Sequence, residues 1–195
     1  MTLNARRIEE DGSVSNEVRF ERLYDRHHAR VAAYCRRRVR ADQVDDLVAE
    51  TFMVAWRRID DVPDGEGGLP WLYRVAYRAV GHHWRSGTRR RRLDNKLVAV
   101  PDLSTSTPED RVVDAEQTRR VLAAASRLNS RDAEILRLLS WEHLSRTEIA
   151  EVLNIAPNAV NQRVHRARTN LTKEFNRLER HHPDRTPVAK KGGVS

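Results

Sequence analysis

The segment Leu144–Arg168, with the sequence LSRTEIAEVLNIAPNAVNQRVHRAR, constrains the fold more than any other part of this chain. Ser145 is followed three residues later by Glu148, a capping-box spacing that predicts the start of a helix. Asn154 suits a tight turn because Asn tolerates a left-handed backbone better than most residues do. Pro157 fits the first turn of a second helix, where its missing N–H costs nothing. The segment therefore predicts two short helices joined by a turn.

The second of these helices is expected to have one buried and one polar side. Apolar residues recur at helical spacing and should face inward: Val160, Val164, Ala167, Leu171 and Phe175. The side chains that then project outward are Asn158, Asn161, Gln162, His165 and Arg166. Asn and Gln pair with adenine and Arg pairs with guanine, so this pattern predicts a helix-turn-helix whose second helix enters the DNA major groove. A helical hairpin with a merely solvated polar face is the alternative that the motif alone leaves open.

Two further arginines complete the predicted reading helix. Arg163 and Arg168 flank the outward-facing side chains, and we expect them to hold phosphates. The whole chain is basic, with 36 Lys and Arg against 28 Asp and Glu and a formal net charge of +8. An excess of this size favours a polyanionic partner, of which nucleic acid is the commonest.

Composition also restricts the architecture. In 195 residues, 33% are charged and 6% are aromatic, so we expect small helical cores and no large β-sandwich. Cys35 is the only cysteine, which excludes an intramolecular disulfide and a cysteine-based metal site. We interpret it as a small buried apolar residue of a helix.

Several function classes find no support in the sequence. The N-terminus lacks the apolar run of a signal peptide, and no segment is apolar enough to span a bilayer, so we expect a soluble, cytoplasmic protein. The chain has no glycine-rich phosphate loop and no hydrolase or metalloprotease motif. We therefore expect no catalytic residues, no cofactor and no bound metal.

The pattern of apolar and polar segments predicts an all-α chain of two small helical domains joined by a flexible linker. The expected divisions are a disordered N-terminus (1–16), a first helical domain (17–94), a linker (95–112), a helix-turn-helix domain (113–178) and a disordered tail (179–195). The linker is assigned from two prolines and a Ser/Thr cluster without helical periodicity. The first domain is expected to hold three helices and the second four.

The helix expected from about Ala41 to Ile59 is sharply two-faced. One side is apolar: Val44, Leu47, Val48, Thr51, Phe52, Ala55 and Ile59. The other side carries Asp42, Asp45, Asp46 and Glu50, alongside Ala49 and Met53. These carboxylates cannot serve DNA, since phosphate would repel them. The acidic side is either an ordinary solvated face or a docking surface for a basic protein, whereas a metal site lacks convergent ligands.

The helix expected from Trp71 to about Arg91 combines aromatic and cationic side chains. Its aromatics are Trp71, Tyr73, Tyr77 and Trp84, and its cationic and imidazole groups are Arg74, Arg78, His82, His83 and Arg85, followed by Arg89–Arg92. Rings that stack on bases and cations that hold phosphates are what single-stranded nucleic acid requires. Some of these aromatics must be core, and Trp71 and Leu72 are placed as packing residues are at a helix start.

Four segments together resemble the bacterial sigma-70 family, specifically the small two-domain extracytoplasmic function (ECF) sigma factors. They are Phe20–Asp25 (FERLYD), Asp45–Phe52 (DDLVAETF) with Trp56, Pro70–Ala76 (PWLYRVA) and Ala156–Arg168. Each motif alone is weak, but they occur in the family's order and at its spacing over roughly residues 17–178.

The resemblance implies a role for each surface. The acidic helix (Asp45, Asp46, Ala49, Glu50 and Met53) would dock on the β′ clamp helices of core RNA polymerase. The aromatic and basic helix (Trp71, Arg74, Tyr77, Arg78, His82 and Arg85) would bind the melted minus-ten promoter element as single-stranded DNA. The helix-turn-helix (Asn158, Asn161, Gln162, Arg163, His165, Arg166 and Arg168) would read the minus-thirty-five element in the duplex. An anti-sigma factor that masks these surfaces is a further expectation from the family.

This chain departs from the family pattern at several of these positions. Ala49 stands where the docking helix usually has Gln, and Arg78 and His82 stand where Asn and Asp are common. Ala156 replaces the usual Ser cap of the reading helix, at a cost of about 1 kcal/mol. These departures predict an altered promoter preference.

Two other functions remain open from the residues alone. A stand-alone helix-turn-helix regulator would use the same reading helix without binding polymerase. A basic helical RNA-binding protein would account for the charge but not for the acidic side of the helix from Ala41 to Ile59.

Overall fold

The protein is described by a computed structural model over residues 3–94 and 115–180, and its side chains over residues 16–85 and 118–180. Within those ranges every regular element is helical, which confirms the all-α prediction. The α-helices are α1 (Leu3–Arg36), α2 (Val44–Arg57), α3 (Gly68–Asp94), α4 (Ala115–Ala125), α5 (Ser130–Ser140), α6 (Arg146–Leu153) and α7 (Pro157–Arg180). Short 3₁₀ turns lie at Ala41–Gln43, Ile59–Asp61 and Gly65–Gly67.

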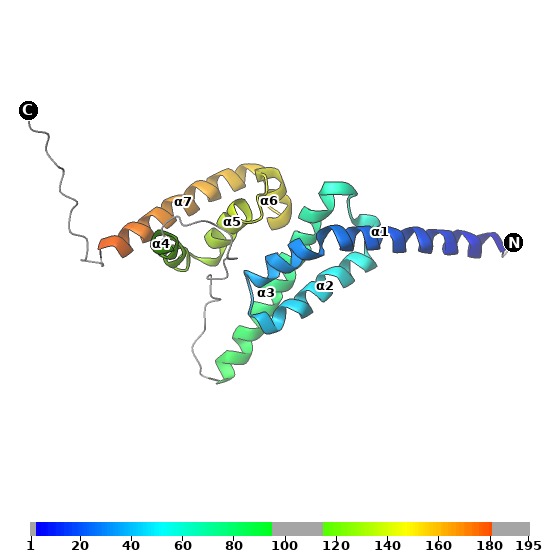
Figure 1. The fold of residues 1–195 in the computed structure, drawn as a ribbon, viewed down its shortest axis with the longest axis horizontal. Helices are drawn as coiled ribbons and strands as arrows, with labels where there is room; N and C mark the ends of the chain where they lie inside the picture. The colour runs from blue at the N-terminus through cyan, green and yellow to red at the C-terminus, as the bar shows by residue number, and fades with distance from the viewer. Residues whose placement is uncertain (1–2, 95–114, 181–195) are drawn as a thin grey trace, which may run out of the picture.

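The first three helices form the N-terminal bundle, in which each helix packs on the other two (Figure 1). Its core is built from the apolar stripes that the sequence predicted, and Leu47, Phe52, Leu72 and Ala76 are all buried. The N-terminal turns of α1 project away from the bundle (Figure 1). The bundle thus leaves one side of α2 free for solvent or a partner.

The last four helices form the C-terminal bundle, where α7 packs against α4, α5 and α6. The Ser145 and Glu148 capping box is present at the start of α6, and Asn154 ends that helix with φ of 50° and ψ of 55°. Helix α7 begins at Pro157. The predicted helix-turn-helix is therefore confirmed in its local chemistry, and Val160, Val164 and Ala167 are buried as expected.

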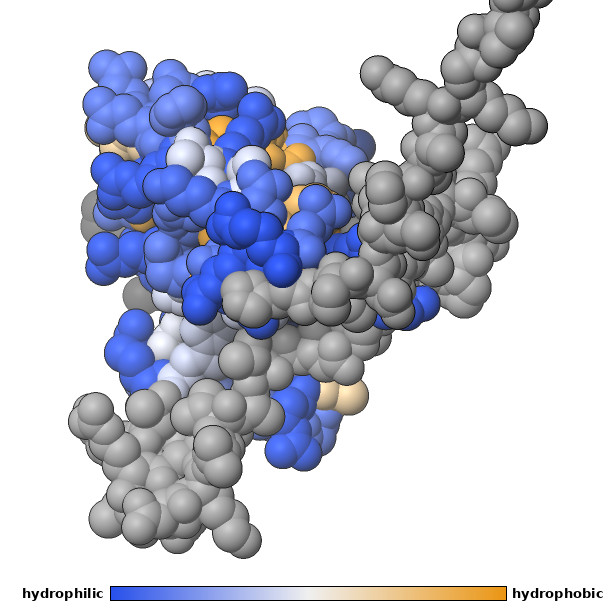
Figure 2. Space-filling view, turned by 90° about the vertical axis from the view of Figure 1, so that its left-hand side faces the viewer, coloured by the Kyte–Doolittle hydropathy of each residue, from blue (hydrophilic) through white to orange (hydrophobic). Residues whose placement is uncertain are grey.

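The two bundles lie side by side, and α6 packs along α3 (Figure 1). Buried apolar residues of both bundles belong to one continuous cluster that runs from Leu23 to Ala167. On the end of the C-terminal bundle that faces the viewer in Figure 2, the described surface is mostly hydrophilic with smaller hydrophobic areas. Among the described helices, none combines the length and apolar character that a membrane span requires.

Some predicted boundaries differ from the structure. Residues 1–16 were expected to be disordered, whereas α1 begins at Leu3. The segment has no proline and many residues of good helix propensity, so the packed part of α1 can propagate toward the N-terminus. Helix α3 also begins earlier than Trp71, at Gly68, and α7 continues to Arg180. The linker (95–112) and most of the tail (181–195) lie outside the described residues.

His27 is a buried ionisable residue of the N-terminal core, with 1% of its surface exposed. It lies beside the loop that leads into α3, where a Cβ added to Gly68 would approach its Nε2 atom to 3.6 Å. Burial lowers the pKa of His27, an effect opposed in part by the backbone of Gly65 and the carboxylate of Glu66. The folded chain therefore prefers the neutral imidazole.

This preference makes stability depend on pH. Because the pKa of His27 is lower in the folded chain than its ordinary value of about 6.5, its contribution is present above that value and is lost as the pH falls through the folded pKa. We predict that the free energy of unfolding falls less in His27→Leu than in wild type between about pH 7.5 and pH 5.5. Urea unfolding at both pH values measures this difference.

The matched control is His165→Leu, which removes an exposed histidine from α7. It should retain the pH dependence of the wild type. Equal slopes in wild type and His27→Leu would contradict the assignment to His27.

Candidate protein and nucleic-acid interfaces

The acidic side of α2 is exposed along its length. Apolar residues bury the opposite side, so Asp42, Asp45, Asp46, Ala49, Glu50 and Met53 all face solvent, Met53 at 53% exposure. Asp45 and Asp46 also lie in the first turn of α2, where the positive end of the helix dipole stabilises carboxylates. We call these six residues the acidic stripe. The structure brings together every residue that the sequence assigned to docking.

An aromatic groove lies beside the acidic stripe, between α1 and α2. Phe20, Tyr24 and His28 of α1 meet Phe52 and Trp56 of α2, with ring centroids 5.2 Å apart for Phe20 and Trp56 and 4.8 Å apart for Tyr24 and Phe52. The groove has a volume of about 650 Å³ and includes Asp45, Ala49 and Met53 of the acidic stripe in its lining.

The sequence analysis placed Phe20 and Tyr24 in a core stripe and did not identify this groove. Tyr24 is 39% exposed and Trp56 is 44% exposed, which is unusual for such large apolar rings. The position of Trp56 outside the apolar side of α2 was the available signal. Exposed aromatic rings beside carboxylates suit a partner that presents both apolar and basic side chains.

The six residues assigned to single-stranded DNA on α3 fall into three environments. Arg78, His82 and Arg85 are exposed, whereas Arg74 and Tyr77 are half-buried. Trp71 is 6% exposed and belongs to the N-terminal core. In this arrangement its ring is not available to stack on a base, so a DNA contact by Trp71 is not supported. The side chains of Arg89–Arg92 lie outside the described ones.

The reading helix α7 presents its predicted side chains to solvent. Asn158, Asn161, Gln162, His165, Arg166 and Arg168 are exposed, and Arg163 is half-buried. The first turn of α7 has no acidic residue that would neutralise the positive end of its dipole. Arg146 of α6, which the sequence analysis did not single out, donates to the Oδ1 atom of Asn161. This contact positions one reading side chain before DNA arrives.

A buried polar cluster joins the two bundles. The guanidinium of Arg38, 1% exposed, donates through Nε to both carboxylate oxygens of Glu134 at 3.0 and 3.1 Å. Its Nη1 donates to Glu142 at 2.9 Å and to the carbonyl of Tyr34 at 2.9 Å. The Tyr34 hydroxyl donates to Glu134, and the Tyr73 hydroxyl donates to Glu142. We call Tyr34, Arg38, Tyr73, Glu134 and Glu142 the interdomain cluster.

The charges of the interdomain cluster compensate one another. Burial alone would lower the pKa of Arg38, but the carboxylate of Glu134 and its neighbours raise that pKa overall. Burial raises the pKa of Tyr73 to about 12, and the carboxylate of Glu142 adds to this effect. Arg38 is thus charged and both tyrosines keep their protons near neutral pH. Residues about a hundred positions apart in sequence form this cluster, and no local motif identifies it.

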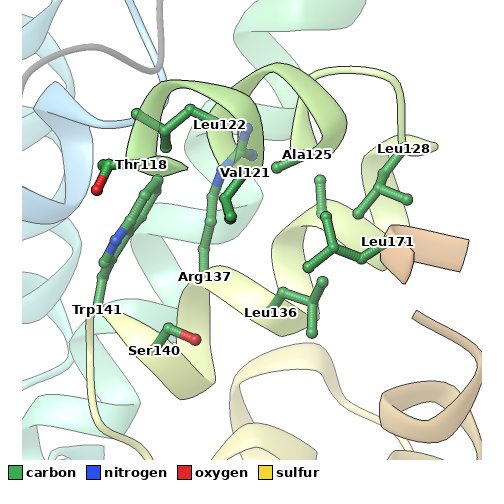
Figure 3. A pocket seen from close by; sticks show the side chains of 11 residues that line it. Thr118, Val121, Leu122, Ala125, Leu128, Leu136, Arg137, Ser140, Trp141 and Leu171 are labelled. Atoms are coloured by element: carbon green, nitrogen blue, oxygen red, sulfur yellow. The ribbon is translucent and has the colours of Figure 1, made fainter. Parts of the chain in front are cut away.

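The C-terminal bundle also contains an apolar groove, with a volume of about 320 Å³ (Figure 3). Val121 of α4, Leu136 of α5 and Leu171 of α7 point into it in this view. Arg137 and Trp141 line the groove and also approach the interdomain cluster. Arg137 pairs with Glu134 at 3.7 Å, and the guanidinium of Arg37 lies 5.8 Å from the ring of Trp141.

The remaining chemical candidates are few. Among the described residues, no group of three or more His, Cys, Asp and Glu side chains could hold a metal ion. Cys35 is buried as expected, and burial raises the pKa of its thiol to about 11. Such a thiol carries little thiolate at neutral pH and is a poor nucleophile.

Comparisons with known proteins match both bundles. The family model for Sigma-70 region 2 matches residues 23–90, and that for Sigma-70, region 4 matches residues 118–171. The RNA polymerase sigma factor NccH of Alcaligenes xylosoxydans is 29% identical over 165 residues, which cover 80% of this chain and 87% of the relative. The ECF RNA polymerase sigma-E factor of Haemophilus influenzae is 27% identical over 157 residues, or 76% and 83% of the two chains.

A solved structure shares the fold. It is the sigma factor RpoE of Bartonella quintana, in complex with the anti-sigma factor NepR, with a TM-score of 0.65 and 20% identity over 85% of this chain and 98% of that one. The two sigma-70 matches together span more than half of the chain and coincide with the two helical bundles. This chain belongs to the sigma-70 family, among its ECF RNA polymerase sigma factors.

Proposed function

We propose that the acidic stripe of α2 binds the β′ clamp helices of core RNA polymerase, while α3 and α7 bind the two promoter elements. The observation that carries this proposal is the separation of charge within a basic chain. Carboxylates occupy the exposed side of α2, whereas DNA-reading amides, a histidine and arginines occupy the exposed side of α7. One surface therefore suits a basic protein and the other suits DNA.

The docking surface is the acidic stripe together with the aromatic groove. Complementary charge would steer and orient a basic partner helix, while the exposed rings of Tyr24 and Trp56 would cover its apolar side chains. Ala49 offers no side-chain hydrogen bond where related chains usually have Gln. Affinity at this position then rests on the neighbouring carboxylates and rings.

Promoter recognition is divided between two helices. On α7, the exposed amides of Asn158, Asn161 and Gln162 would read base edges, and Arg163 and Arg168 would hold phosphates. On α3, the exposed cations of Arg78 and Arg85 and the ring of Tyr77 would hold the melted strand. In this proposal the polymerase performs the chemistry, and the chain acts in the cytoplasm and is not itself an enzyme.

Regulation by an anti-sigma factor is part of the proposal. The related sigma factor of Bartonella quintana was solved in complex with such a protein. An inhibitor that covers the acidic stripe or the groove beside it would prevent docking on polymerase. A stand-alone DNA-binding regulator would have no use for either surface.

Charge reversal tests the docking surface. We predict that Asp45→Lys/Asp46→Lys weakens binding to core polymerase by at least about tenfold, because two attractive contacts become repulsive in an otherwise intact helix face. A pull-down of purified core enzyme at fixed ionic strength measures this. The matched control is Asp60→Lys/Asp61→Lys, on the exposed turn after α2. A wild-type chain that fails to bind inhibitor-free core enzyme would exclude the proposed function.

The reading helix makes a separate prediction. Gln162→Ala should relax preference at one base pair, with a loss of about 1–3 kcal/mol of discrimination, whereas Arg168→Ala should weaken binding to all sequences and reduce the salt slope by about 1. Selection of promoter sequences by the reconstituted holoenzyme, followed by titration at several salt concentrations, separates the two effects. Equal losses on every sequence for Gln162→Ala would contradict its role as a base reader.

A further inference from the structure

Helix α3 has two buried faces, and they belong to different contacts. Leu72, Ala76 and Ala79 share one face and lie in the N-terminal core. Tyr73, Tyr77, Val80 and Trp84 recur at helical spacing about a quarter turn away. We call these four residues the second stripe. Tyr73 and Val80 are 1% and 2% exposed, and Tyr77 and Trp84 are half-buried.

The second stripe is on the side of α3 that meets the C-terminal bundle. Tyr73 stacks on Tyr34 with ring centroids 4.8 Å apart, and its hydroxyl contacts Glu142 between α5 and α6. Helix α6 packs along α3 over this region. The ring of Tyr77, which the proposed function assigns to the melted strand, is on this same side of the helix. A base cannot stack on a face that another helix covers.

We propose that the C-terminal bundle and single-stranded DNA compete for the second stripe of α3, and that the interdomain cluster is the latch that holds this stripe covered. This inference rests on the proposed function of α3. It adds that the free chain is closed toward the downstream promoter element until polymerase or DNA separates the bundles.

The other two surfaces remain free in the closed arrangement. The acidic stripe of α2 is exposed, and so are the base-reading side chains of α7. The closed chain can therefore dock on polymerase and contact duplex DNA before it opens. Only the single-strand surface depends on opening, which makes the competition specific to promoter melting.

The chemistry of the latch suits a reversible contact. A buried ion pair recovers in attraction little more than it loses in desolvation, so it contributes less net stability than an apolar contact of similar size. Arg38, Glu134 and Glu142 can each regain water when the bundles part. The same pair is specific, because removal of one partner leaves a buried charge without compensation.

Isosteric neutralisation of the carboxylates tests the latch. In Glu134→Gln/Glu142→Gln the guanidinium of Arg38 loses both charged partners, while α3 and α7 keep their sequences. We expect a larger radius of gyration by small-angle X-ray scattering. We also expect about fivefold or tighter binding to a short, fluorescein-labelled single strand of mixed sequence, since the competent population rises. The matched control Glu151→Gln changes an exposed carboxylate of α6 and should leave both quantities unchanged.

A second measurement uses the wild-type chain and so does not depend on how a variant folds. Trp84 is on the second stripe, whereas Trp141 is in the other bundle beside Arg37. In 5-fluorotryptophan-labelled protein, the single strand should shift the ¹⁹F resonances of both residues together, because binding at α3 requires the bundles to part. Saturation of the Trp84 shift with an unchanged Trp141 resonance would overturn the proposal.

The outcomes separate this inference from the proposed function. An opened double variant whose affinity for the single strand equals that of wild type also overturns the competition, and so does a double variant that stays closed. If wild-type holoenzyme fails to bind the same single strand, the assignment of α3 fails and the competition fails with it. Binding by the holoenzyme without a latch effect leaves the proposed function intact.

Discussion

The arrangement of the whole chain depends on one buried charge, the guanidinium of Arg38. It is on the last turns of the region described after α1, and its partners Glu134 and Glu142 belong to the other bundle. A buried arginine is tolerated only when its charge and its donors are satisfied. The N-terminal bundle alone supplies the carbonyl of Tyr34, and both carboxylates come from the C-terminal bundle. The cluster therefore specifies which faces of the two bundles meet.

This contact has a functional consequence because of what surrounds it. Tyr73 is both a member of the interdomain cluster and a residue of the second stripe, which also carries Tyr77 and Trp84. Burial of that stripe uses aromatic rings as packing surface in one state and leaves them for bases in another. The acidic stripe and the reading side chains of α7 need no such exchange, since they face solvent in the closed state.

The local chemistry of the helices was predictable from the sequence. The capping box of Ser145 and Glu148, the left-handed Asn154 and the helix start at Pro157 all depend on a few neighbouring residues, and all are present. The two faces of α2 and α7 follow from helical periodicity in the same way. The sequence did less well where periodicity is ambiguous. Trp71 fits a DNA contact and a core position equally, and its burial was decided by the packing of α3.

The sequence by itself determined the number of helical bundles, the exposed acidic and base-reading faces, and the family, because each of these depends on short-range patterns. Only the tertiary structure decided which surfaces are covered. The aromatic groove between α1 and α2, the closure of α6 on α3 and the pairing of Arg38 with Glu134 and Glu142 join residues far apart in the chain. Such contacts arise from the desolvation of whole faces, and no spacing between neighbouring residues encodes them.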